Sequence, residues 1–374
     1  MTLGVPEAPQ SRLVAMLDLV PQDVLGLATG WAHVRYVDYA ALFASEGLSA
    51  IRDVRDLELI LTSVPLGSLL GRIAAGPQAL QYLFSSAGRM AEVVGFEWLT
   101  HVDRSLEFGE PPAVGLVLEG PFDTGAIAAA LAGRGFEQRT VNGVEVWHRF
   151  DDWTVNLTAR ELADPFGGHL GAAARIAVLP ATLLSGRGWG IVEAGIAASQ
   201  GEISSLGDDA GHRALVEVLA GADYPPIQAL LFPGPALRVH GEDWPADDLS
   251  DRLAPYLLAG LADRQEGDDQ VHVIGLVYPD ADNARAASEV LHRRIQAFAL
   301  PQAPQEPLVE RFGAAVTPAV IQRPQEGLSV AVVEVRYPLP YPRLDAQTGM
   351  YTVGGQLYRL WVQAILMRAF SALW

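Results

Sequence analysis

Residues 114–136 read VGLVLEGPFDTGAIAAALAGRGF, and this stretch decides the fold. An apolar run is followed by a short turn and then by an Ala-rich segment that ends at glycine. This order predicts a strand followed by a helix. Asp123 stands where the helix N-cap is expected. The stretch therefore predicts one β-α unit.

A weaker copy of this unit lies at 274–295 and reads IGLVYPDADNARAASEVLHRRI. Val114-Gly115-Leu116-Val117 aligns with Ile274-Gly275-Leu276-Val277, and Asp280 takes the N-cap position of Asp123. Two units of one kind predict an α+β protein built from two related halves. We expect each half to be ferredoxin-like, an α/β sandwich with an antiparallel-rich sheet and helices on one face.

The sequence between the two units supplies the other elements of the first half. Asn142-Gly143 between two alternating runs is a strong β-hairpin signal. Further strands are expected at 153–158, 175–179 and 226–232, and helices at 187–199 and 208–220. An edge strand is expected at 101–108, and the clearest strand of the chain at 328–337.

These elements divide the chain into three parts. Residues 1–232 form an N-terminal α+β half that carries a helical insert at 49–107. Residues 233–270, rich in proline and acidic side chains, predict a connector interrupted by one helix at 247–261. Residues 271–374 form the C-terminal half, which ends in an apolar helix.

Composition excludes several functions. Of 374 residues, 50% are hydrophobic and 19% are charged, which is typical of a globular protein. The net charge is −18 without a basic cluster, so nucleic acid is not an expected partner. The chain contains no Lys and no Cys. Schiff-base chemistry, P-loop phosphate binding, thiol nucleophiles and Cys-ligated zinc are therefore excluded.

Two runs near the start resemble a known group of proteins. MLDLVP at 16–21 and VRYVDYAALFASEGL at 34–48 are similar to the opening of uncharacterised bacterial cell-envelope proteins of actinobacterial type, many of them lipoproteins. The resemblance implies an extracytoplasmic location; without it, the cytoplasm is expected. It implies no catalytic residues. Membrane anchoring is in doubt, because the chain has no Cys and its first residues lack a signal-peptide pattern.

Two clusters have residue types suited to chemistry. His148 lies close to Asp151 and Asp152, and a His–carboxylate pair can act in general acid–base catalysis. Asp is also typical of turns, which is the favoured interpretation. The densest set of possible metal ligands comprises His240, Glu242, Asp243, Asp247, Asp248 and Asp251. Its spacing does not match an EF-hand loop, and helix capping explains Asp247 and Asp248.

The glycine-rich run at 185–190 could hold an anion at a helix start, although a tight turn is the simpler interpretation. The tail at 355–374 is strongly apolar but carries Arg359 and Arg368, which disfavour a membrane span. We expect a helix buried in the fold or against a partner. Its candidate interaction residues are Leu357, Leu360, Trp361, Ile365, Phe370 and Trp374.

These patterns lead to one main functional hypothesis. We assign no catalytic, cofactor-binding or metal-binding residues, and we expect no cofactor. The hypothesis is a non-enzymatic binding or structural protein of the bacterial cell envelope, associating with itself or a protein partner through the 355–374 helix. The alternatives are a hydrolase that uses His148 with Asp151 or Asp152, and a carrier of a small apolar ligand.

Overall fold

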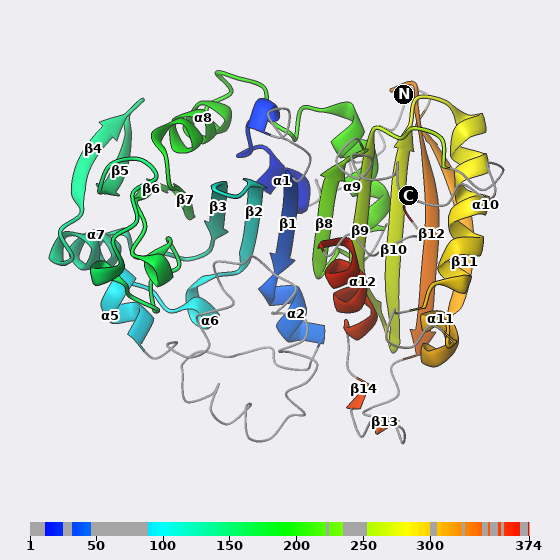
Figure 1. Cartoon of the computed structure of the whole chain (residues 1–374). Coiled ribbons are helices and arrows are strands. Elements are labelled where there is room, and N and C mark those ends of the chain that lie inside the picture. The colour runs from blue at the N-terminus through cyan, green and yellow to red at the C-terminus, as the bar shows by residue number, and fades with distance from the viewer. Residues whose placement is uncertain are drawn as a thin grey trace, which may run out of the picture.

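The computed structural model describes residues 12–24, 32–45, 89–221, 224–234, 253–299, 305–323, 326–338, 343–344, 351–352, 355–366 and 373. Within these ranges the protein is a mixed α+β structure with one large antiparallel sheet (Figure 1). In spatial order its twelve strands are β11 (Ala315–Arg323), β12 (Leu328–Pro338), β10 (Asp269–Tyr278), β9 (Leu258–Glu266), β8 (Gln228–Pro233), β1 (His33–Asp38), β2 (Arg104–Glu110), β3 (Ala113–Glu119), β7 (Thr182–Gly186), β6 (Ala174–Leu179), β5 (Val144–Arg149) and β4 (Glu137–Val141).

Helices cover both faces of this sheet. On the first face, α1 (Arg12–Leu17), α8 (Trp189–Ser199) and α9 (Ala210–Ala220) enclose one hydrophobic core that runs along the sheet from β5 to β12. On the second face, one core lies under α2 (Tyr39–Ser45), α5 (Met90–Val94), α6 (Trp98–His101) and α7 (Thr124–Gly133). Another lies under α10 (Ala281–Ala297), α11 (Leu308–Phe312) and α12 (Gln356–Leu366).

Several short elements complete the described chain. Three 3-10 turns are η1 (Gln22–Val24), η5 (Leu157–Ala159) and η6 (Gly168–Leu170). A separate two-stranded ladder joins β13 (Arg343–Leu344) to β14 (Tyr351–Thr352).

The two β-α units of the sequence occupy comparable places. In each, a hairpin (β2–β3 or β9–β10) leads to a helix on the second face (α7 or α10), and a later strand (β7 or β12) returns to pair with the hairpin's second strand. Asp123 and Asp280 cap the two helices through their carboxylates, as the sequence predicts. The strands β1 and β8 meet in the middle of the sheet.

Close packing explains why glycine occupies the two aligned positions, Gly115 and Gly275. A Cβ on Gly115 would lie 2.3 Å from the Phe108 ring, and one on Gly275 would lie 2.7 Å from Leu215 of α9. Both positions point to the first face, where the neighbouring side chains of the core leave no room for even a methyl group.

The sheet corrects three expectations about architecture. It is one continuous sheet and not two separate ones, because β1 pairs with β8 and β8 pairs with β9. Helices lie on both of its faces and not on one. The expected edge strand at 101–108 begins instead at Arg104 as β2, which lies in the interior between β1 and β3.

The predicted connector at 233–270 is wrong over its second part. Residues 258–266 form β9, and β10 begins at Asp269, so the helix expected at 247–261 does not extend to residue 261. The acidic appearance of this stretch is misleading, since Asp263 and Arg264 are buried and paired. Residues 235–252 lie outside the described residues, as do residues 49–88 of the predicted helical insert.

Elsewhere the local predictions have mixed outcomes. The hairpin is confirmed, with Asn142 and Gly143 both at positive φ, as a tight two-residue turn requires. The strand expected at 153–158 is wrong: Trp153 has a φ of +65°, η5 begins at Leu157, and only Val155 forms an isolated bridge. Helix α10 and strand β12 lie where the sequence places them.

Candidate functional site

The residues of the hydrolase alternative, His148, Asp151 and Asp152, do not form a catalytic group. His148 lies on β5 with its ring 5.1 Å from the ring of Trp189, and burial lowers its pKa. Asp152 is held elsewhere, because its Oδ1 pairs with Arg175 at 2.6 Å and its Oδ2 accepts the Trp189 backbone N–H at 3.1 Å. No hydrogen bond or ion pair of the described residues joins His148 to Asp151 or Asp152.

The same contacts explain the glycine-rich run at 185–190. Gly188 is the N-cap of α8 but has no side chain to accept a bond from the first helical N–H groups. Asp152 supplies that acceptor from a distant part of the chain. The sequence leaves open an anion at this helix start beside the simpler interpretation of a tight turn, and the group that accepts the Trp189 N–H is an internal carboxylate, that of Asp152.

A second His–carboxylate pair lies under α12. His272 Nδ1 is 3.5 Å from Asp263 Oδ1, and its Nε2 is 3.0 Å from the Tyr337 hydroxyl. Gln270 Nε2 donates to the same Asp263 oxygen at 2.5 Å. His272 and Asp263 are 0% exposed, so a substrate has no access to them. This group holds the interior together and is not a reaction centre.

The possible metal ligands at 240–251, to which we assign no metal site, lie outside the described residues. In the part of the chain that the structure describes, no group of three or more His, Asp or Glu side chains is arranged to hold a metal ion. Among the same residues, no helix has the length and apolar character needed to cross a membrane.

The expected interaction residues of the tail turn inward. Leu357 and Trp361 are 0% exposed and Ile365 is 3% exposed, all in the core beneath α12. Leu360 is half-buried against that core, while Phe370 and Trp374 lie outside the described residues. The prediction that Leu357, Trp361 and Ile365 meet a partner is therefore wrong, because the protein's own sheet occupies their apolar face.

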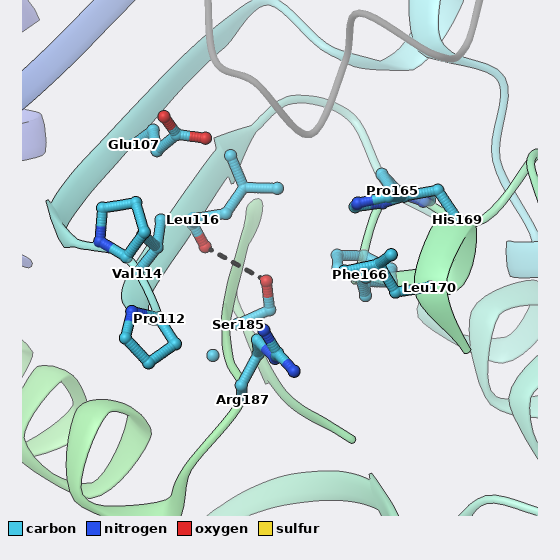
Figure 2. Close-up of a pocket in the computed structure, with 13 residues that line it drawn as sticks. Glu107, Pro112, Val114, Leu116, Pro165, Phe166, His169, Leu170, Ser185 and Arg187 are labelled. Atoms are coloured by element: carbon cyan, nitrogen blue, oxygen red, sulfur yellow. Dashed lines mark hydrogen bonds between the residues drawn. The ribbon is translucent and has the colours of Figure 1, made fainter. Parts of the chain in front are cut away.

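The best candidate site is a cavity of about 240 Å³ on the second face of the sheet (Figure 2). Its floor is a row of paired residues, in which Glu107 of β2 lies opposite Leu116 of β3, and Leu116 lies opposite Ser185 of β7. Alternation along these strands points all three side chains to the same face. The Ser185 hydroxyl donates to the Leu116 carbonyl at 3.5 Å.

The opposite wall is the segment 161–171, called the wall segment below. It contributes Pro165, Phe166, His169 and Leu170 to the cavity. Asp164 fixes it: one carboxylate oxygen accepts the Phe166 N–H at 2.8 Å, and the other pairs with Arg134 of the neighbouring helix end at 2.8 Å. Gly168 packs so tightly on Asp164 that a Cβ there would lie 2.3 Å from it.

The cavity is largely apolar, with charge at its margins. Its apolar lining residues include Pro112, Val114, Leu116, Phe166 and Leu170. Glu107 is 5% exposed and has Arg35 at 4.0 Å and His33 at 3.8 Å. Figure 2 shows Glu107 and Arg187 at opposite ends of the group, with Leu116 and Ser185 between them.

Sequence reasoning missed most of this site. Val114 and Leu116 belong to the β-α stretch at 114–136, and Ser185, Gly186 and Arg187 to the glycine-rich run at 185–190, but the first suggested only a strand and the second a turn. Glu107, His169 and the wall segment lack a recognisable motif, because the strand pairing that brings them together joins residues far apart in the chain. Alternation in β2 places Glu107 on the face opposite Leu106 and Phe108, which would have suggested exposure to solvent, whereas Glu107 is 5% exposed.

Comparisons with known proteins add little. No protein-family model and no curated protein matches the chain. Among solved structures, crystal forms I and III of TP0453 are similar to it at 8% identity and a TM-score of 0.36, over 84% and 85% of this chain and 93% and 94% of theirs. Crystal form IV of TP0453 gives 9% identity and a TM-score of 0.32, over 83% of this chain and 92% of that one. A likeness this weak does not support an argument about fold or function.

Proposed function

We propose that the protein is a non-enzymatic binding protein of the bacterial cell envelope and that it carries a small, mostly apolar ligand. The observation that supports this is the cavity between β2, β3, β7 and the wall segment. Concave, mostly apolar sites with a few polar groups at fixed positions are typical of small-molecule binding. The cavity of about 240 Å³ has room for a ligand of roughly ten heavy atoms, given that a water molecule takes about 30 Å³.

The arrangement of the polar side chains favours binding over the hydrolase alternative. His148 and Asp152 do not line the cavity, and Asp152 is committed to Arg175 and to the N-terminus of α8. Ser185 does line it, but its hydroxyl donates to a backbone carbonyl and not to a base. An activated nucleophile needs a general base within hydrogen-bond reach.

Binding is tested by titrating the protein with 1-octanol, a neutral probe of suitable size, in isothermal calorimetry. Val114→Phe should fill the cavity and weaken binding at least tenfold. Val155→Phe is the matched control, since Val155 is 46% exposed and does not line the cavity. Absence of octanol binding to the unmodified protein, or equal binding by both variants, would contradict the proposal.

The envelope location is supported by the resemblance of 16–21 and 34–48 to cell-envelope proteins. The two runs correspond to the end of α1 and its following turn, and to β1 with α2. Fractionation of the native cells with an antibody against the protein tests the location. Recovery in the cytoplasmic fraction alone would rule it out.

Association through the tail is a second proposal, and fewer residues of α12 are available for it than the sequence suggests. With Leu357, Trp361 and Ile365 buried, what remains on α12 is the partly covered Leu360 and Leu366, which is 37% exposed. Leu366→Asp should lower the apparent mass in light scattering if α12 contributes to a self-association surface. An unchanged mass, or a monomeric parent protein, would exclude α12 as that surface.

We also propose that the two halves are related by duplication, each derived from a ferredoxin-like unit. The shared hairpin–helix–returning-strand order, the two Asp caps and the aligned glycines support this. In spatial order the N-terminal unit runs outward from β1 to β4, and the C-terminal unit runs outward from β8 to β11. The N-terminal unit has two more strands than the C-terminal one. An alignment of distant relatives that matched 114–136 with 274–295 would test it.

A further inference from the structure

The cavity contains one arginine that lacks a carboxylate partner. Three other arginines of this region pair with a carboxylate: Arg134 with Asp164, Arg175 with Asp152 and Arg104 with Glu119. Arg160 has no such pair among the described residues, but its Nε donates to the His169 backbone carbonyl at 2.7 Å. Arg187 lines the cavity, yet within the described residues its guanidinium makes no ion pair or hydrogen bond, and its Nε is buried. In a chain of net charge −18, a guanidinium without a carboxylate at the margin of an apolar cavity is conspicuous.

The electrostatic surroundings of Arg187 favour a negative charge beside it. His169, on the facing wall, has its pKa lowered by burial first and then by Arg187 and Arg160. Burial is the largest cause, and the two arginines add a positive potential at this ring. A carboxylate beside Arg187 would gain from that potential.

Among the described residues, the opposite end of the cavity has no cation without a carboxylate, so an anionic end fits better at Arg187. Glu107 is buried there with Arg35 and His33 already beside it. Between Glu107 and Arg187 the floor and wall are apolar, formed by Val114, Leu116 and Phe166. A ligand whose anionic end lies at Arg187 would place its apolar body on this surface (Figure 2).

We propose that the ligand is a small amphiphilic carboxylate: one carboxylate that meets Arg187, joined to an apolar body of fewer than about ten heavy atoms, the size set by the cavity. A single planar guanidinium matches a carboxylate through two parallel hydrogen bonds. This inference rests on the proposed carrier function and specifies its ligand class.

The test compares three probes of nearly equal length: octanoate, 1-octanol and octylamine, titrated at pH 7.5 in calorimetry. The unmodified protein should bind octanoate at least tenfold more tightly than octanol, and octylamine most weakly. Arg187→Gln should remove the preference, so that octanoate binds no more tightly than octanol to this variant. Arg187→Lys keeps the positive charge but not the planar pair of donors, so its preference for octanoate over octanol should be smaller than that of the unmodified protein and larger than that of Arg187→Gln.

Controls separate this inference from the proposed function. Arg285→Gln on α10 removes an exposed arginine far from the cavity and should leave all three affinities unchanged. Circular dichroism and thermal unfolding show whether each variant is folded. If octanol binds but octanoate binds no better, or if a folded Arg187→Gln keeps the preference, the carboxylate inference is overturned while the carrier proposal stands. If neither octanol nor octanoate binds, both are overturned.

Discussion

Asp152 and Trp189 are joined by a hydrogen bond in which the Trp189 backbone N–H donates to the Asp152 carboxylate at 3.1 Å. The contact closes the N-terminus of α8 with a residue that lies 37 positions earlier in the chain. The other oxygen of Asp152 neutralises Arg175, whose side chain is 2% exposed. One carboxylate thus serves both a helix start and a buried cation.

Asp152→Ala should therefore destabilise the protein by about 1–2 kcal/mol, the usual cost of losing a capping acceptor, with a further loss from leaving Arg175 unpaired. Chemical denaturation with urea measures this. Asp151→Ala is the control: Asp151 is exposed, and its side chain makes no hydrogen bond that the structure describes. Its effect should stay within about 0.5 kcal/mol. Equal effects of the two substitutions would contradict the capping role.

The pKa of His169 gives a second prediction. Because burial, Arg187 and Arg160 lower it, the unfolded chain takes up a proton at higher pH than the folded one. Stability should therefore fall as the pH drops below about 6.5, the ordinary value for histidine, and should be unaffected by this residue above it.

In Arg187→Gln the pKa of His169 should rise toward its ordinary value, since one of the two arginines that lower it is gone. Burial and Arg160 would still hold it down in part. Titration of the imidazole protons by NMR measures the change. An unaltered pKa in the variant would show that Arg187 and His169 do not share the cavity as described.

The glycines on the first face of the sheet supply a third prediction. Gly275→Ala would place a methyl group 2.7 Å from Leu215, so it should cost about 1–3 kcal/mol, as overpacking of a core does. Gly190→Ala in α8 is the matched control, because a Cβ there meets nothing within 4 Å. That substitution should be neutral or stabilise the helix by up to about 1 kcal/mol. Thermal unfolding distinguishes the two.

The docking of α12 supplies a fourth prediction. Trp361 is 0% exposed and meets the His272 ring edge-on, with the ring centroids 5.7 Å apart. Trp361→Ala should cost about 3–5 kcal/mol, measured by urea denaturation. Leu366→Ala on the exposed side of the same helix should have little effect. Comparable losses at both positions would mean that α12 is not docked through this face.

Much of the local structure could be predicted from the sequence, where one residue type has one conformational role. Asn142-Gly143 defines a hairpin, Asp123 and Asp280 define helix starts, and the apolar run of β12 defines a strand buried on both faces. In each case the signal is short-range, so a single sequence contains it.

The errors come from contacts that are distant in the chain. Asp263 and Arg264 look like connector residues until His272, Gln270 and Glu334 provide partners for them in the interior. The apolar residues of the tail suggest an interface with a partner, but Leu357, Trp361 and Ile365 pack in the core on the protein's own sheet. The segment at 153–158 has a composition typical of a strand. The indole of Trp153 packs on Gly188, however, and the Trp153 backbone adopts a positive φ.

The cavity was hidden from the sequence for the same reason. Glu107, Leu116 and Ser185 become neighbours only through the pairing of three strands, and Arg134 orders the wall segment through Asp164. The apolar character of Leu116 is visible in the sequence, but its place on a cavity floor is not. The order of strands in a sheet depends on long-range contacts that local patterns do not specify.

The pairing of β1 with β8 has a consequence for how the molecule comes apart. β8 pairs with β9 and so belongs to the C-terminal half, not to the N-terminal half that the expected boundary at residue 232 implies. β1 and β8 would therefore each be an unpaired border of its own half, and the pairing of Val34 with Leu231 and of Tyr36 with Ala229 covers both borders at once. An unpaired border readily recruits strands from other chains. The two halves, if produced separately, should therefore aggregate or recombine with each other, and the intact chain should melt in a single cooperative transition.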